Sequence, residues 1–270
     1  MRLMLVLLMG WMLLRSGVTM DAASAACRLF VQSVLPGLFP YMVLSLMLVS
    51  RMGAAMPRWL LVLLGWCGGS PTGARLLALS PAPDKRTAVM CATMSPMFLL
   101  GTLGSWLGSL RAGMCILLAV VLGGWLTGLM LPSGKAAPSG QQTAPLSFGE
   151  AVTQAAKTML MVCGTMVMLR TLAALVTEAT DAVLPGLTLP LTTLLEVTTG
   201  TRLMAELPLP LPLRAALMAG ATGTGGAAIL MQNRAAYPKG FISLPEQALW
   251  QGVHGVISFG LALGLMLLWP

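Results

Sequence analysis

Charged residues and the side chains on which enzymes depend are scarce in this chain. Only 9% of its 270 residues are Asp, Glu, Lys or Arg, 6% are aromatic, and there is one histidine. The residues provide no Ser-His-Asp or Cys-His set, no P-loop and no metal cluster. The five cysteines include no C-x-x-C pair, which argues against a disulfide framework or a metal site. We therefore expect no enzymatic activity and no cofactor, and an intramembrane enzyme ranks last among the alternatives.

Apolar residues are correspondingly abundant. They make up 57% of the chain, and the mean hydropathy is +0.85. No soluble domain needs so much apolar sequence, so we expect a multi-pass α-helical protein of the cell membrane, with the lipid bilayer as its first partner. The net charge of +8 comes from single basic residues at the ends of apolar segments. That pattern is typical of membrane loops rather than of a nucleic-acid-binding surface.

The first apolar run covers residues 3–14 and has two readings. We expect an uncleaved N-terminal transmembrane helix over residues 1–20, because similar membrane segments follow it. The alternative is a signal peptide, with the small residues at 22–26 as its cleavage site. The next helix, over residues 21–50, contains Pro36 and Pro40, which predict a kink or a break.

Two polar stretches interrupt the apolar sequence and resemble each other. Gly73 and Gly200 are 127 residues apart, as are Arg75 and Arg202. The similarity predicts a duplicated chain, with repeat 1 at residues 21–131, a flexible Pro- and Gly-rich linker at 132–147, and repeat 2 at 148–270. Each repeat is expected to contain three transmembrane helices and one re-entrant hairpin, and an odd number of spans inverts the second repeat relative to the first.

The hairpins are expected at about residues 58–79 and 183–206. The apolar run 59–66 is too short to span a bilayer, which takes about 20 residues. The Gly-Gly-Ser-Pro sequence that follows cannot continue a helix, and in lipid such a break survives only where protein or a water-filled cavity covers it. A cytoplasmic N-terminus then places most loop lysines and arginines in the cytoplasm, at positions 51, 58, 85, 86, 135, 234 and 239.

The two hairpin tips are the predicted binding site. A broken helix exposes free N–H groups on one side and free carbonyls on the other, which can hold anionic groups and cations respectively. Nearby hydroxyl, charged and glycine residues complete the candidate set, which is Ser70, Thr72, Gly73, Arg75, Ser95, Glu196, Thr198, Thr199, Gly200, Arg202 and Thr222.

Several of these residues have a structural alternative to binding. The two arginines either contact a solute or pair with Glu196 or Glu206 and brace the hairpins. Glu196 is a candidate for proton or Na⁺ coupling, unless it lies near enough to the surface to be solvated. The glycines also permit close helix packing. For the single histidine, His254, we expect a place on a polar face inside the helix bundle rather than a metal-ligand role.

Four motifs in this order resemble the YlbJ-type sporulation integral membrane proteins. They lie at residues 34–40, 69–75, 95–102 and 195–200, and the resemblance extends from about residue 21 to the last apolar segment. That family is associated with the nucleoside-recognition (Gate) domain, which is similar to the hairpin core of concentrative nucleoside transporters. The resemblance implies a transporter-like fold and a role in spore envelope or cortex formation.

These observations predict a protein that moves or gates a small polar or anionic solute during endospore formation. The alternative is a non-transporting membrane scaffold required for assembly of the spore cortex or envelope, with envelope or sporulation proteins as partners. A scaffold predicts dry, mutually paired tips, whereas a transporter predicts a site between them. The sequence leaves the oligomeric state open, a homo-oligomer included.

Overall fold

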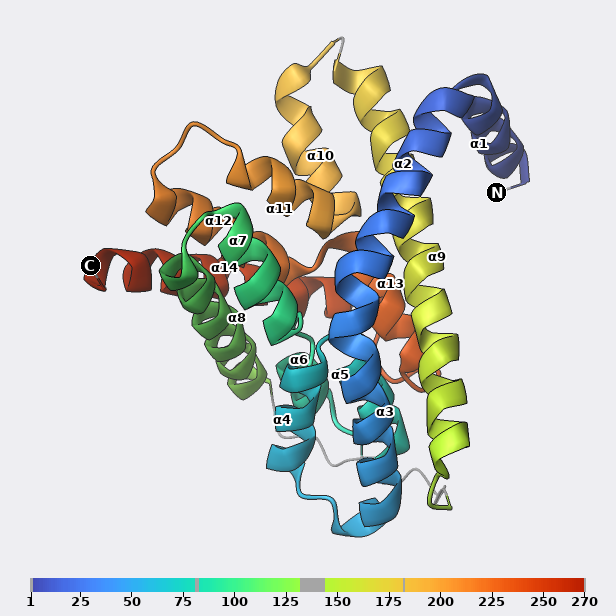
Figure 1. Ribbon diagram of the computed structural model, residues 1–270, viewed down its shortest axis with the longest axis vertical. Coiled ribbons are helices and arrows are strands. Elements are labelled where there is room, and N and C mark those ends of the chain that lie inside the picture. Colours follow the sequence, from blue (N-terminus) through green and yellow to red (C-terminus); the bar gives the residue numbers. More distant parts are fainter. Residues whose placement is uncertain (1, 81–82, 132–143, 182, 270) are drawn as a thin grey trace.

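The computed structural model describes residues 2–80, 83–131, 144–181 and 183–269 (Figure 1). Within these ranges every regular element is a helix, and no strand occurs. The all-α class predicted from the sequence is therefore confirmed. Most of the predicted linker, residues 132–143, lies outside the described residues.

Four helical segments are long and apolar enough to cross a membrane. They are Ser16–Met52, α8 (Leu110–Met130), α9 (Phe148–Asp181) and α14 (Leu244–Leu268). Each has at least 21 residues, and a span needs about 20. Their length and composition support the expected membrane location.

The N-terminal region is divided at Arg15. α1 (Arg2–Leu14) has 13 residues, and α2 (Ser16–Leu29) begins a new helix on the other side of Arg15. A helix of that length is roughly 20 Å long, shorter than the bilayer core. Where a single helix over residues 1–20 is expected from the sequence, the described part, residues 2–20, is divided between two helices.

The segment Ser16–Met52 runs without a break through both prolines. α2 passes into a π-helical turn, η1 (Phe30–Val34), and then into α3 (Leu35–Met52). Proline donates no hydrogen bond, and its ring crowds the carbonyl four residues earlier. For Pro36 that carbonyl belongs to Gln32, inside the π-helical turn, so a locally wider helix accommodates the proline.

The remaining helices are short. Most are too short to span a bilayer. They are η2 (Gly53–Ala55), α4 (Arg58–Gly68), α5 (Thr72–Leu79), α6 (Lys85–Met90), η3 (Met97–Leu103), α7 (Gly104–Trp106), η4 (Pro185–Leu187), α10 (Thr188–Leu195), α11 (Val197–Ala205), α12 (Leu211–Thr224) and α13 (Gly226–Ala236).

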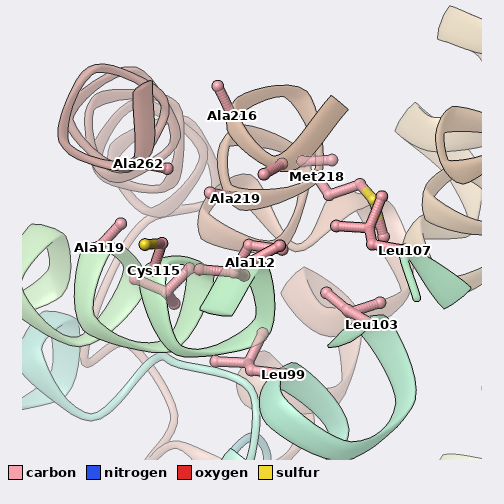
Figure 2. Close-up of a cluster of buried hydrophobic side chains, with 14 of the residues drawn as sticks. Leu99, Leu103, Leu107, Ala112, Cys115, Ala119, Ala216, Met218, Ala219 and Ala262 are labelled. Atoms are coloured by element: carbon pink, nitrogen blue, oxygen red, sulfur yellow. The ribbon is translucent and has the colours of Figure 1, made fainter. Parts of the chain in front are cut away.

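Two apolar clusters hold the helices together. The first packs α3, α4 and α5 against α9, with Met42, Leu46 and Leu76 fully buried. The second lies among η3, α8, α12 and α14 and is built from small side chains and leucines (Figure 2). In Figure 1 the long helices α2–α3 and α9 run together along the long axis, while α8, α12 and α14 lie to the left.

The shorter helices are interrupted at four places that matter for the site. Two are tight turns, one between α4 and α5 at residues 69–71 and one between α10 and α11 at Glu196. The others are the unwound segment 91–96 and Gly225, which separates α12 from α13. In Figure 1 the α4–α5 pair lies in the lower part of the molecule and α10–α11 in the upper part. The first turn falls at the Gly-Gly-Ser-Pro sequence, where the sequence predicts a broken helix, and the second lies at Glu196, inside the range predicted for the second hairpin.

Candidate central cavity

A small internal cavity joins both turns and both broken helices. Its polar lining comes from the π-helical turn η1, the first turn, segment 91–96, the second turn and α13. It measures about 50 Å³, enough for a few water molecules at roughly 10–15 Å³ each on this measure. The polar residues of the lining are Ser33, Ser70, Ser95, Glu196, Thr198 and Gln232, and the apolar ones include Phe98, Val162, Met166 and Ile229.

The first turn is held by backbone packed on backbone. Gly69 has φ +64° and ψ −177°, a conformation that is essentially restricted to glycine. A Cβ atom there would lie 2.9 Å from the Cα of Ser95 and closer still to its nitrogen. The amide of Ser70 donates to the carbonyl of Thr93 at 2.6 Å. Glycine therefore lets the α4–α5 turn lie directly on the unwound segment.

The second turn is held by a side chain. Glu196 is 1% exposed, and its carboxylate caps the N-terminus of α11. One oxygen accepts from the amide of Thr198 at 2.9 Å, and the other accepts from the amide and the hydroxyl of Thr199 at 2.8 and 2.6 Å. The positive end of the helix dipole favours the same charge. These contacts satisfy the buried carboxylate locally.

A glycine also brings the second broken helix close to the second turn. Gly226 has φ +62°, and a Cβ atom there would lie 2.8 Å from the carbonyl oxygen of Thr193 and 3.0 Å from that of Leu194. The start of α13 thus packs on the end of α10, as Ser95 packs on Gly69 at the first turn. Each turn therefore rests against the backbone of a broken helix.

The cavity gathers four of the predicted site residues. Ser70 and Thr198 approach it from the two turns, Ser95 from the unwound segment, and Glu196 from the cap of α11. Ser70 also accepts a hydrogen bond from the amide of the Asn233 side chain at 3.3 Å. These residues come from both predicted repeats, so the structure brings the two predicted tips together.

Four other predicted residues have packing or capping contacts outside the cavity. Thr72 is buried and donates to the carbonyl of Gly68 at the end of α4, and Thr222 is buried and donates to carbonyls within its own helix, α12. Gly73 and Gly200 sit where helices touch: a Cβ at Gly73 would be 2.7 Å from Cys91, and one at Gly200 would be 2.6 Å from the Cα of Thr193. Close packing explains these two glycines.

Thr199 faces a separate groove between α2, α9, α10 and α11. The groove measures about 440 Å³ and also holds Asp21 and Arg170. Thr198 lines the central cavity and its neighbour Thr199 lines this groove. The start of α11 therefore lies between the two spaces.

The two predicted arginines lie apart from the cavity. Arg202 is half exposed, pairs with Glu206 at 2.9 Å, and places its guanidinium 5.3 Å from the ring centre of Trp106. Arg75 is partly buried and has no ion pair among the described residues. Of the pairings considered from the sequence, the structure shows Arg202 with Glu206. Neither guanidinium contributes charge to the lining that the structure describes.

Two polar residues of the cavity lining, one on η1 and one on α13, were not predicted from the sequence. Ser33 and Gln232 line the cavity, and the Gln232 amide donates to the hydroxyl of Thr165 at 2.9 Å. Asn233 is 1% exposed, and its side-chain oxygen has no hydrogen-bond partner among the described residues. Two adjacent amides at the end of an apolar run were the available signal, because buried polar groups in membrane helices are costly and usually functional.

Comparison with protein-family models, with curated proteins and with solved structures finds no match. The functional conclusion therefore rests on the geometry of this cavity.

Proposed function

We propose that the chain moves or gates a small polar solute through the central cavity. The observation that carries the proposal is the cavity itself, which lies between two helix turns and two broken helices and has hydroxyl, amide and carboxylate groups set in an otherwise apolar lining. Irregular backbone at membrane depth is tolerated where it lines a cavity, and solute sites of membrane carriers are built this way.

In this proposal α4–α5 and α10–α11 are re-entrant hairpins of two inverted repeats. Their helices have 8 to 11 residues, which is at most roughly 16 Å and about half of the bilayer core. The two pairs lie in opposite parts of the molecule, and their turns meet at one cavity (Figure 1). With the N-terminus in the cytoplasm, α4–α5 enters from the cytoplasmic side and α10–α11 from the outside.

The lining favours an uncharged polar solute over an anion. Hydroxyls of Ser70, Ser95 and Thr198 and the amide of Gln232 offer donors and acceptors, and both arginines lie elsewhere. The charge of Glu196 is already matched by the N-terminus of α11. Since the cavity holds only a few waters, a larger solute requires the hairpins to move apart. The setting of endospore formation rests on the sequence resemblance alone.

A second candidate function is the non-transporting scaffold. The observation in its favour is that both turns make their own closing contacts: the amide of Ser70 donates to the carbonyl of Thr93 at the first, and Glu196 caps α11 at the second. A scaffold needs no solute, and its cavity is a packing defect.

Solute binding separates the two functions. The purified chain is heated with a panel of neutral polar solutes, carboxylates and phosphate esters, and its melting temperature is measured. A ligand at about 100 times its Kd stabilises the folded state by about 2.7 kcal/mol. We expect a neutral polar solute to raise the melting temperature of the wild type.

A pair of neighbouring alanines on α13 provides the control. Ala228 lines the cavity and Ala227 does not, so Ala228→Leu fills the site and Ala227→Leu leaves it open. The solute should stabilise the wild type and Ala227→Leu but not Ala228→Leu. Equal stabilisation of all three proteins, or none by any solute of the panel, would overturn the proposal and favour the scaffold.

A further inference from the structure

A buried polar stripe runs along one face of α14. Gln247, Gln251, His254 and Ser258 are spaced four, three and four residues apart, which places them on one side of a helix. Each is at most 7% exposed. Polar residues inside a membrane span are costly, and they usually mark a pathway or a relay. The central cavity does not include them.

The ring of His254 is fixed by one hydrogen bond. Its Nε2 atom lies 2.8 Å from the carbonyl oxygen of Val120 on α8. A carbonyl can only accept, so Nε2 carries the hydrogen, and in the neutral ring Nδ1 is the free base. The ring packs on Gly124, where a Cβ atom would lie 3.3 Å from Nε2. The absence of a side chain at Gly124 therefore leaves room for the imidazole beside α8.

Several polar atoms along the stripe lack a partner. The side-chain oxygens of Gln247 and Ser258, and the hydroxyl of Thr93 nearby, have no hydrogen bond among the described residues. A cavity of about 10 Å³ lies among Gln247, Gln251, His254 and Tyr237, which is room for about one water molecule. Unsatisfied buried polar groups beside such a space call for water.

The stripe connects a charged end of the molecule with the central cavity. At its start, Glu246 pairs with Lys85 at 2.8 Å at the surface. At its inner end, the side chains of Thr93 and His254 both pack against Gly124. Thr93 belongs to the unwound segment that lines the central cavity, next to Met94 and Ser95.

Beyond Ser258 the same face of α14 is apolar. Ala262 and Met266 belong to the cluster shown in Figure 2. The polar path thus covers one half of the helix and ends near the broken segment.

We infer that this stripe is a hydrated half-path that delivers protons from the Lys85–Glu246 end to His254, so that solute movement is coupled to protons through His254. The inference rests on the proposed function. A proton from water adds to Nδ1 to give the imidazolium, and it returns to water on the cavity side when the ring is neutral again. Of the side chains in the stripe, histidine is the one that can take up and release a proton.

The other ionisable groups around α14 do not replace it. Lys85 and Glu246 lie at the surface end, Arg111 binds the carbonyl of Trp269 at the opposite end, and Arg214 binds the carbonyl of Ala205. Tyr237 is the other ionisable side chain in the wall of the small cavity, and Cys91 and Cys115 are buried thiols. Glu196, the coupling residue considered from the sequence, is occupied as a helix cap.

The single histidine makes a direct test possible. The full chain is produced with ¹⁵N-labelled histidine and reconstituted in phospholipid vesicles, and nitrogen NMR follows the ring from about pH 8 to about pH 4. We expect the Nε2–H tautomer at the upper pH and a reversible gain of the imidazolium signal at the lower pH. A ring that stays neutral throughout would overturn the inference, because the stripe would then be dry packing.

A matched pair of variants tests the path. Gln251→Leu removes the amide between the surface and His254, whereas Gln154→Leu makes the same change on α9. After a pH jump the imidazolium signal should appear more slowly in Gln251→Leu than in the wild type, and at the wild-type rate in Gln154→Leu. An unchanged rate in a folded Gln251→Leu protein would overturn the path, and if that variant does not fold, Gln251→Met takes its place. Neither result depends on a solute, so failure here leaves the solute-binding test of the central cavity standing.

Discussion

The two turns beside the central cavity are held in place by different contacts. The first turn has no charge, and Gly69 lets its backbone touch the unwound segment at Ser95. The second turn contains the buried carboxylate of Glu196, which holds the amides of α11. Two turns that meet at one cavity therefore need not be held by the same kind of residue. The first turn depends on the absence of a side chain, and the second depends on one.

The largest effect is expected at Gly69. Gly69→Ala places a Cβ against Ser95 in a conformation that alanine rarely adopts, so we expect a loss of roughly 3 kcal/mol or more in the free energy of unfolding in detergent. Gly108 also has positive φ, but no atom lies within 4 Å of its Cβ position. Gly108→Ala should cost only about 1 kcal/mol. Equal losses in both variants would show that the close contact with Ser95 does not matter.

Loss of the carboxylate at Glu196 should come next. In Glu196→Gln an NH₂ group replaces one oxygen and faces a donor, either the amide of Thr198 or that of Thr199. A buried donor without an acceptor costs about 1–3 kcal/mol. Thermal unfolding of this variant is compared with that of Glu206→Gln, whose side chain is exposed. The account fails at the second turn if both substitutions have the same small effect.

Two corresponding glycines test the similarity of the turns. Gly73→Ala would press on Cys91, and Gly200→Ala on Thr193. Overpacking of this kind costs typically 1–3 kcal/mol, so both variants should melt at lower temperature by similar amounts. A large effect at one position and none at the other would break the correspondence between the two helix pairs.

The smallest effect is expected at Arg202. Its ion pair with Glu206 is exposed, and its guanidinium lies over Trp106. Exposed ion pairs and cation–π contacts each contribute about 1 kcal/mol or less. Arg202→Ala should therefore lower the melting temperature only slightly and leave solute-induced stabilisation unchanged. Loss of that stabilisation would mean that the arginine contacts the solute.

The sequence was sufficient for some of the helix breaks but not for side-chain directions. Gly69, Pro71 and Gly225 lie at helix breaks, as their residue types favour, whereas Pro36 and Pro40 lie inside a continuous helical segment because the π-helical turn accommodates the first proline. Which way Arg75 and Arg202 point depends on the rotation of α5 and α11, and tertiary packing sets that rotation.

Two other features show where local sequence is sufficient and where it is not. The capping role of Glu196 is a local pattern, a carboxylate followed by two threonine amides, and was available from the sequence. Gln232 reaches the cavity only because Gly225 ends α12 and redirects α13 toward Thr165 on α9. A long-range contact of this kind has no local signal.

The most direct test is the solvent access of the two turns. The native cysteines at 27, 67, 91, 115 and 163 are replaced, and single cysteines are placed at Ser70, Thr198 or Thr222. Ser70 and Thr198 line the cavity, while Thr222 is buried in α12 outside it. Each protein in vesicles is treated from either side with a membrane-impermeant thiol reagent. The account predicts reaction at Ser70 and Thr198, each from at least one side, and none at Thr222. Folded proteins in which neither turn reacts would contradict a gated pathway.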